Sequence, residues 1–173
     1  LRSTPKDTMR ACQKLYEAGL ITYMRTDSRT YNKEFVDNAK KYIEKTWNEK
    51  YVNEKIDDLT ERKQEKKKDK PKSQEAHEAI RPTNITRKTI TDDFTLKEQK
   101  MYALIWRNTC QSCMSSAVYS SLQSKISAPD SYEYRYSCEE PVFLGWHVLS
   151  NTEPDSKSYN YILSMKNNEA IKY

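Results

Sequence analysis

Residues 4–28 read TPKDTMRACQKLYEAGLITYMRTDS, and this stretch predicts a helix that leads directly into a short extended segment. Thr4 offers a side-chain cap, a proline follows in the first helical turn, and an acid stands three residues after the cap. Apolar side chains then recur at helical spacing, at Met9, Cys12, Leu15 and Tyr16. Gly19, one of 2 glycines in the chain, stands where a left-handed residue would end the helix. We therefore expect the helix to hold residues 21–23 in a fixed position.

The extended segment places a tyrosine hydroxyl near a guanidinium. Residues i and i+2 of an extended chain point to the same face, so Tyr23 and Arg25 can converge on one anion. Tyrosine alone is a poor nucleophile because its ordinary pKa is about 10. A neighbouring arginine lowers the cost of forming phenolate and offers a planar fork of donors to phosphate oxygens. The pair therefore indicates phosphodiester chemistry; the structural alternative is a packed ring beside a solvated cation.

Two longer motifs carry a resemblance to the type IA DNA topoisomerases. The one that resembles the family's active-site signature reads Gln13-x-Leu15-Tyr16-Glu17-x-x-x-Ile21-Thr22-Tyr23-x-Arg25-Thr26-Asp27. The second, SQEAHEAIRPT at residues 73–83, resembles the family's histidine-bearing motif. The resemblance implies an α+β fold. A helical, winged-helix-like gate domain at residues 1–116 would precede the antiparallel strands of a partial, arch-type β-domain at residues 117–173.

For the matching positions, the resemblance implies nucleophilic catalysis on DNA. Tyr23 would attack a phosphodiester of single-stranded DNA and become joined to the 5′-phosphate. Another strand would pass through the break, and the free 3′-hydroxyl would reseal it without ATP, relaxing negative supercoils. Arg25 would stabilise the transition-state charge, and His77 would donate to a phosphate oxygen. The supporting residues of this site would be Glu17, Thr22 and Asp27.

Other parts of the machinery are expected outside this stretch. The family's magnesium-binding acidic cluster and its general acid belong to a separate domain, and no D-x-D-x-E-like cluster occurs here. We therefore expect Mg²⁺ to be bound outside residues 1–173, and the piece alone to be inactive. The expected partners are single-stranded or negatively supercoiled DNA and the remaining domains of the parent chain. Met24 resembles the topoisomerase I branch, because topoisomerase III-like members often carry proline there.

Composition adds weaker constraints. Charged residues make up 32% of the chain and hydrophobic ones 36%, and 30 basic against 25 acidic residues give a net charge of +5. This charge is too small to indicate a nucleic-acid partner by itself. No apolar run approaches a membrane span and no secretory signal opens the chain. We expect an intracellular, DNA-associated piece of a larger protein with no membrane partner.

Between the two motifs, a second helix is predicted from about Asn32 to Tyr51, because its apolar residues form one stripe. A charged insertion is predicted near residues 57–72, and its last part, Glu61 to Lys72, holds seven basic and three acidic side chains. Such a run is typical of a solvated loop, although Lys72 is a candidate DNA contact. Arg81, in the second motif, would contact the DNA backbone or pair with an acid.

The last part of the chain predicts a helix followed by strands. Thr95 and Glu98 form a capping box, and helical spacing continues to Met114. Beyond it, alternating runs predict three or four antiparallel strands, with members at Leu122, Tyr134, Trp146, Val148, Tyr159, Tyr161 and Leu163. His147, expected in one of these strands, is interpreted as structural. The Cys110-x-x-Cys113 pair lacks a second pair at metal-binding spacing, so packing thiols are favoured.

Two functional alternatives remain open. A non-catalytic, winged-helix-like DNA-binding module would suit short helices followed by strands and basic loops, with Tyr23 merely stacking or packing. A relaxase-like tyrosine transferase is disfavoured because the chain offers no histidine cluster to hold that family's metal. An upstream domain with clustered glutamate and aspartates in the parent gene would favour the topoisomerase interpretation.

Overall fold

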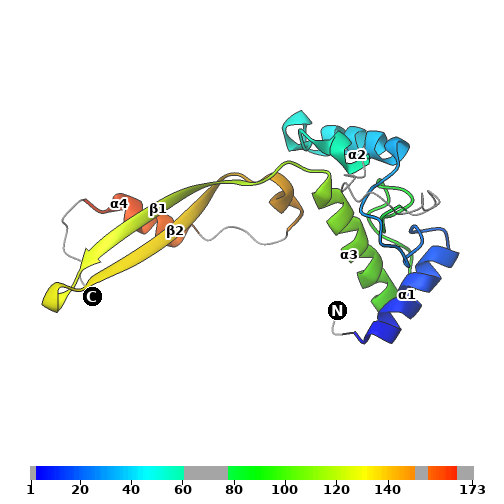
Figure 1. Ribbon diagram of the computed structural model, residues 1–173, viewed down its shortest axis with the longest axis horizontal. Helices are drawn as coiled ribbons and strands as arrows, with labels where there is room; N and C mark the ends of the chain where they lie inside the picture. Colours follow the sequence, from blue (N-terminus) through cyan, green and yellow to red (C-terminus); the bar gives the residue numbers. More distant parts are fainter. Residues whose placement is uncertain (1–2, 61–77, 151–155, 167–173) are drawn as a thin grey trace, which may run out of the picture. The chain divides into compact units, whose positions relative to one another are not determined.

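The computed structural model describes residues 3–60, 78–150 and 156–166 and has two compact units, Leu1–Ser115 and Ser116–Tyr173. The described residues form four α-helices and a two-stranded antiparallel sheet (Figure 1). The α+β class is therefore confirmed. The first unit contains helices and isolated β-bridges within its described part, so its winged-helix-like character stays a prediction.

Helix α1 spans Pro5–Glu17, and both of its ends follow the local signals of the sequence. The Asp7 backbone N–H donates to the Thr4 hydroxyl, as an N-cap requires. At the other end, Gly19 has a φ of +68°, its N–H donates to the Tyr16 carbonyl, and the Leu20 N–H donates to the Leu15 carbonyl. This is the Schellman arrangement, which satisfies the last carbonyls and turns the chain sharply out of the helix.

Helix α3, at Leu96–Ser112, lies alongside α1 and forms the centre of the first unit (Figure 1). The core between and around these helices contains Leu15, Met101, Tyr102 and Trp106, each at most 4% exposed. The Trp106 indole N–H donates to the Ile85 carbonyl at 2.7 Å, so α3 also holds the segment that follows the second motif. The capping box at Thr95 and Glu98 is confirmed.

Helix α2 spans Lys33–Thr46 and is shorter than the sequence predicted. The apolar stripe is correctly placed, but the backbone leaves the helix at Asn48, whose φ is 155° and whose side chain accepts from the Lys50 N–H. Two short 3-10 helices follow, η1 at Glu49–Tyr51 and η2 at Ile56–Thr60. Residues 57–60 of the predicted insertion belong to η2 and are exposed or half-buried, and residues 61–72 lie outside the described part, so the insertion stays a prediction.

The second unit is a β-hairpin with one helix beside it. Strand β1 at Val118–Ser127 pairs antiparallel with β2 at Glu133–Phe143, with Leu122 opposite Cys138. The connection contains the 3-10 turn η3 at Pro129–Ser131. Beyond β2 lie the 3-10 helix η4 at Gly145–Leu149 and helix α4 at Lys157–Ser164.

The prediction of one or two further strands was wrong among the described residues. Trp146, His147 and Val148 lie in η4, and His147 stacks on Trp146 with ring centroids 3.7 Å apart. Tyr159 and Tyr161 belong to α4: Tyr159 is buried and its hydroxyl bonds to the Ser120 hydroxyl at 2.8 Å, whereas Tyr161 is 54% exposed. A short run with an apolar residue at every second position is compatible with a strand and also with a helix that is buried on one side. Here the contact with β1 accompanies the helix.

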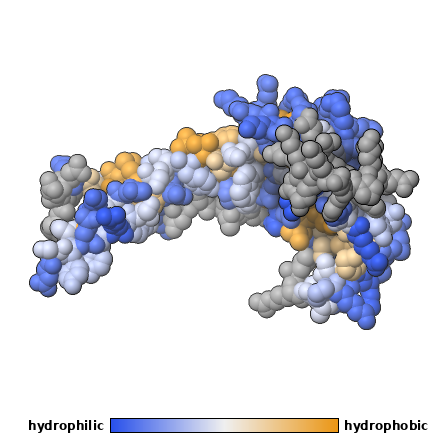
Figure 2. Space-filling view, viewed as in Figure 1, coloured by the Kyte–Doolittle hydropathy of each residue, from blue (hydrophilic) through white to orange (hydrophobic). Residues whose placement is uncertain are grey.

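Hydrophobicity is distributed unevenly over the surface. Figure 2 shows mainly hydrophilic residues around α2 and several hydrophobic areas on the hairpin unit. Exposed apolar side chains of that unit include Val118, Val142 and Leu163, at 52%, 71% and 60% exposure. Within the described ranges, no helix combines the length and apolar character needed to cross a membrane.

The C-x-x-C cysteines are packing thiols, as predicted. Both are fully buried in the first unit, and burial raises the pKa of Cys110 to about 12 and that of Cys113 to about 11. Both thiols therefore stay protonated at neutral pH, and thiolate is the form that binds metals and reacts. All four cysteines are free.

Replacement of Glu98 by Gln is expected to remove a pH-dependent part of the stability. Burial raises the pKa of this carboxyl, but hydrogen bonds from Lys14 and from Thr95 outweigh it and hold the pKa below the ordinary 4.5. Its contribution is therefore present above pH 4.5 and is lost as the pH falls through the lowered value. We expect Glu98→Gln to lose about 1 kcal/mol at pH 7 and less at pH 3.

Urea unfolding at the two pH values measures this difference. The control is Glu139→Gln on the exposed side of β2, which should change stability little at either pH. An equal loss for Glu98→Gln at both pH values would show that its charge is not the stabilising feature.

Candidate active site

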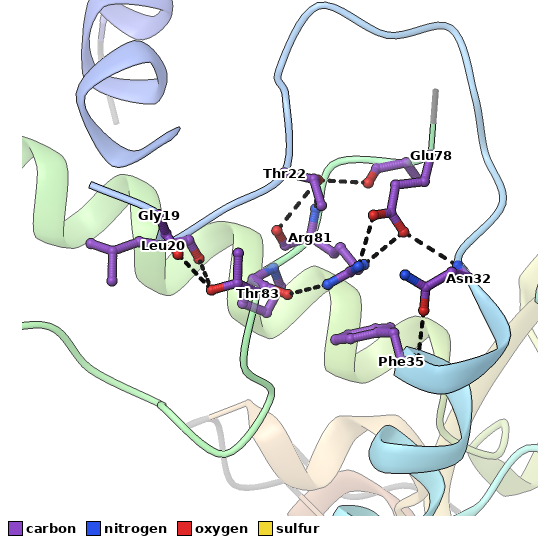
Figure 3. Close-up of polar contacts among 10 residues, drawn as sticks. Gly19, Leu20, Thr22, Asn32, Phe35, Glu78, Arg81 and Thr83 are labelled. Carbon is purple, nitrogen blue, oxygen red and sulfur yellow. Dashed lines mark hydrogen bonds and ion pairs between the residues drawn. The ribbon is translucent and has the colours of Figure 1, made fainter. Parts of the chain in front are cut away.

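The two sequence motifs meet through backbone hydrogen bonds. Residues 20–22 lie antiparallel to residues 81–83: the Thr22 N–H donates to the Arg81 carbonyl at 2.9 Å, and the Thr83 N–H donates to the Leu20 carbonyl at 3.0 Å (Figure 3). The Thr83 hydroxyl also donates to the Gly19 carbonyl at 2.7 Å. The residue that ends α1 and the segment that leads to Tyr23 are thus both held by the second motif.

Residues 22–31, which we call the tyrosine loop, are closed at both ends by one segment of that motif. The Thr22 hydroxyl donates to the Ala79 carbonyl at 2.8 Å. The Ala79 N–H donates to the Thr30 carbonyl, also at 2.8 Å. Just beyond the loop, the Asn32 N–H donates to a Glu78 carboxylate oxygen at 3.3 Å. The loop therefore stands on a neck made by residues 78–79.

A partly buried ion pair holds the residues that form this neck. The Arg81 Nε and Nη2 atoms donate to the two Glu78 carboxylate oxygens at 2.9 and 2.7 Å (Figure 3). A third donor, Nη1, reaches the Pro82 carbonyl at 3.0 Å, and the guanidinium lies 4.3 Å from the centre of the Phe35 ring. Bidentate pairing of this kind is strong and geometrically specific.

Tyr23 itself is accessible. Its side chain is 39% exposed, and its ring makes an edge-to-face contact with Tyr16 of α1, with centroids 5.2 Å apart and planes at 67°. The chain bends at Met24 and Arg25, so the segment is not a regular strand. Met24 is nevertheless buried while Tyr23, Arg25 and Asp27 are exposed, so the alternation still turns the tyrosine and the arginine to solvent.

Comparison with known proteins identifies the relatives of this arrangement. The family profile described as DNA topoisomerase (Topoisom_bac) matches residues 1–173. This chain belongs to the type IA DNA topoisomerase family and is topoisomerase I-like.

Several relatives and a solved structure illustrate the extent of the match. The chain is 36% identical over 145 residues to DNA topoisomerase 1 of Buchnera aphidicola, which covers 83% of this chain and 16% of the relative. DNA topoisomerase 1 of Escherichia coli is 39% identical over 127 residues, or 72% of this chain and 14% of the relative. The fold matches full-length topoisomerase I of Thermotoga maritima with a TM-score of 0.69, at 26% identity, over 89% of this chain and 25% of that one. The chain thus spans no more than a quarter of these proteins.

The structure changes the interpretation of one site residue of this topoisomerase chain. Two roles were predicted for Arg81, and it has the second, pairing with an acid. The side chain is 7% exposed and its donors are used within the protein. A direct contact between Arg81 and the DNA backbone stays a prediction, and it would require the guanidinium to leave the half-buried Glu78 carboxylate.

The remaining predicted residues divide into three groups. Thr22 takes part in the neck, with its hydroxyl donating to Ala79 and accepting from the Arg81 N–H at 2.9 Å. Glu17 is exposed at the end of α1 and accepts from Gln13 at 2.7 Å. Asp27 is exposed on the tyrosine loop. His77 and Lys72 lie outside the described residues, so their roles stay predictions; His77 directly precedes Glu78 in the sequence.

Metal binding is a separate question for the topoisomerase. Within residues 3–60, 78–150 and 156–166, no three His, Cys, Asp or Glu residues gather in a way that could hold a metal ion. These residues therefore do not fit a magnesium site, and no chemical step is assigned to a metal held by them.

Three residues that organise the site were not singled out from the sequence. Tyr16 was quoted as part of the first motif without a role, although its position one helical turn before Gly19 places it near the start of the loop. Glu78 stands three residues before Arg81, but the segment is not helical, so the pairing could not be inferred from helical spacing. Ala79 acts through its backbone, for which side-chain identity provides no signal.

Removal of the Tyr16 ring is expected to weaken the orientation of Tyr23. Aromatic edge-to-face pairs contribute about 0.5–1.5 kcal/mol beyond burial, so we expect Tyr16→Ala to slow covalent adduct formation in the full-length parent by about 3- to 10-fold. Tyr16→Phe keeps the ring and should restore most of the rate. Single-turnover cleavage of a labelled single-stranded oligonucleotide measures both variants, and equal losses for Phe and Ala would assign the effect to the hydroxyl instead.

Proposed function

We propose that this chain is the tyrosine-bearing part of a type IA DNA topoisomerase. The parent enzyme cleaves single-stranded DNA through a 5′-phosphotyrosine intermediate, passes a strand through the break and reseals it without ATP, relaxing negative supercoils. The observation that supports this most directly is the hydrogen-bonded neck, through which the second motif holds both ends of the loop that carries Tyr23. Membership of the DNA topoisomerase family supports it independently.

The chemistry assigned to the loop is a phosphoryl transfer. The Tyr23 oxygen loses its proton to a base and forms a bond to phosphorus, the bond from phosphorus to the 3′-oxygen breaks, and that oxygen takes up a proton to leave as a hydroxyl. Resealing reverses these steps. One phosphodiester is exchanged for another of similar energy, so the reaction needs no ATP.

Charged groups of this chain would assist that transfer. The exposed Arg25 guanidinium, two residues from Tyr23, stabilises negative charge on the phosphoryl oxygens as the transition state forms. His77 is assigned the donation of a hydrogen bond to a phosphate oxygen, from its place in the second motif. Thr22 holds the segment that leads to Tyr23, and Glu17 and Asp27 orient the site.

The rest of the machinery is assigned to other domains of the parent. Mg²⁺ and the general acid would be supplied from outside residues 1–173, and the isolated piece would bind single strands weakly and cleave nothing. The first unit would act as a winged-helix-like gate domain and the hairpin unit as part of the arch-type β-domain. The parent acts on intracellular, single-stranded or negatively supercoiled DNA.

Trapping the intermediate in the full-length parent tests this function. A single-stranded oligonucleotide is labelled at either its 5′ or its 3′ end, and the reaction is stopped with denaturant. Because the tyrosine is joined to a 5′-phosphate, the 3′-labelled fragment should remain attached to protein, and the 5′-labelled fragment should be released with a free 3′-hydroxyl. Peptide mapping should place the adduct on Tyr23.

The same experiment separates the main alternative. A non-catalytic, winged-helix-like binding module would retain DNA in a native gel but give no adduct that survives denaturant. Attachment of the 5′-labelled fragment, or an adduct on another residue, would contradict the proposed mechanism.

A further inference from the structure

The tyrosine loop carries a second exposed arginine, Arg29, two residues before its last residue. From residue 23 to residue 30, odd-numbered side chains are exposed and even-numbered ones are at least half-buried; the exposed residues are Tyr23, Arg25, Asp27 and Arg29. The inward hydroxyls hold the backbone, since the Ser28 N–H donates to the Thr26 hydroxyl at 3.0 Å and the Ser28 hydroxyl bonds to that of Thr30 at 3.2 Å. Arg29 is thus presented to solvent by a loop with internal support.

The neck brings the two ends of the loop close together. Ala79 accepts from the Thr22 hydroxyl through its carbonyl and donates to the Thr30 carbonyl through its N–H, both at 2.8 Å. The N and O atoms of one residue are only a few Å apart, so the bonded atoms of Thr22 and Thr30 lie within about 10 Å of each other. Tyr23 follows one end and Arg29 precedes the other. An extended chain would instead separate these two residues by up to about 20 Å.

Four cations in the described part of the first unit form ion pairs, and Arg29 is not among them. These ion pairs join Lys14 to Glu98, Lys97 to Asp7, Lys33 to Asp37, and Arg81 to Glu78. Arg25 and Arg29 make no ion pair with any residue in the described part of the chain. Asp27, which lies between them, leaves the exposed face of the loop with two positive charges and one negative charge.

We propose that Arg29 is a second phosphate-binding residue of the Tyr23 site, and that it holds a DNA backbone phosphate within a few nucleotides of the scissile one. This inference rests on the proposed function, because it concerns the same DNA strand. Arg25 and Arg29 would bind different phosphates on either side of the loop, so the strand would lie across the loop with its scissile phosphate at Tyr23. A guanidinium suits this role because its fork can donate two hydrogen bonds to one phosphate.

Binding of single-stranded oligonucleotides to the full-length parent, measured by fluorescence anisotropy at several salt concentrations, tests the proposal. Arg29→Gln should weaken binding about 5- to 10-fold and reduce the slope of log K against log salt by about 0.7, the change expected for one lost phosphate contact on a single strand. Arg29→Lys should restore the slope and part of the affinity. The control Arg135→Gln, on the hairpin, removes the same charge from an exposed ion pair and should change neither quantity.

A scan with single uncharged methylphosphonate linkages locates the contact. In the wild-type protein, one linkage near the scissile phosphate should weaken binding as much as Arg29→Gln does, and that same linkage should have no further effect in the variant. The proposal would be overturned if binding by Arg29→Gln had the same salt slope as binding by Arg135→Gln. It would also be overturned if every methylphosphonate linkage weakened binding by the same factor in Arg29→Gln as in the wild-type protein. Absence of a covalent adduct with wild-type protein would count against the proposed function alone, because the binding measurement does not depend on cleavage.

Discussion

Tyr23→Phe in the full-length parent is expected to reduce cleavage of single-stranded DNA by more than about 1,000-fold, because a covalent pathway has no substitute for its nucleophile. The substitution removes one hydroxyl that makes no hydrogen bond within the described part of the chain, and it keeps the ring that packs against Tyr16. Folding and DNA binding should therefore be retained. Quantification of the protein–DNA adduct after denaturant measures the loss, and anisotropy measures the retained binding.

Tyr16→Phe provides a matched control for this experiment. It removes the same hydroxyl from the partner ring, 5.2 Å away, and should retain most of the cleavage. A covalent adduct formed by the Tyr23→Phe protein would show that another residue is the nucleophile. Loss of DNA binding together with cleavage would indicate that the hydroxyl has a structural role.

Glu78→Ala is expected to loosen the neck that supports the tyrosine loop. The substitution leaves the Arg81 guanidinium, 7% exposed, without the carboxylate that accepts two of its hydrogen bonds. Breaking a buried pair by removing one partner costs about 3–5 kcal/mol, and the half-buried position of Glu78 favours the lower figure. We expect the Thr22 and Ala79 amides to exchange with solvent about 100-fold faster in the parent protein, measured by hydrogen exchange.

An exposed pair of the same residue types serves as the control. Glu133 accepts from Arg135 at 3.0 Å on the hairpin, where the arginine side chain is 79% exposed, so Glu133→Ala should change local exchange by less than about threefold. Equal effects for the two glutamates would show that burial does not strengthen the Glu78–Arg81 pair. Unchanged exchange at Thr22 would show that the pair does not support the loop.

Local sequence signals were sufficient where a side chain acts on backbone a few residues away. The Thr4 cap, the left-handed Gly19 and the Thr95–Glu98 capping box are all set by contacts that span five residues or fewer. Such contacts depend little on the rest of the fold, so the start and end of α1 and the start of α3 could be predicted. The spacing of apolar residues likewise identified the buried side of α2.

Local sequence signals did not predict where α2 ends or that Tyr159 and Tyr161 lie in a helix. The apolar stripe of α2 continues past Thr46, but the backbone leaves the helix at Asn48. The alternating tyrosines at Tyr159 and Tyr161 fit a strand equally well, yet contact with Ser120 of β1 buries only the first and accompanies a helix. The first outcome accompanies a bond between Asn48 and Lys50 that apolar periodicity does not report, and the second involves Ser120, 39 residues away from Tyr159.

The motifs around Tyr23 and residues 73–83 were enough, without coordinates, to identify the topoisomerase family and to name the candidate nucleophile. Their mutual arrangement required the fold, because Thr22 and Ala79 are separated by 57 residues and meet through the Thr22 hydroxyl and the Ala79 backbone carbonyl. Arg81 illustrates the same limit: its charge suggested DNA contact, whereas burial against Phe35 and pairing with Glu78 assign it to the neck. Charge and spacing are properties of the chain, but burial and loop closure depend on which distant segments fold against each other.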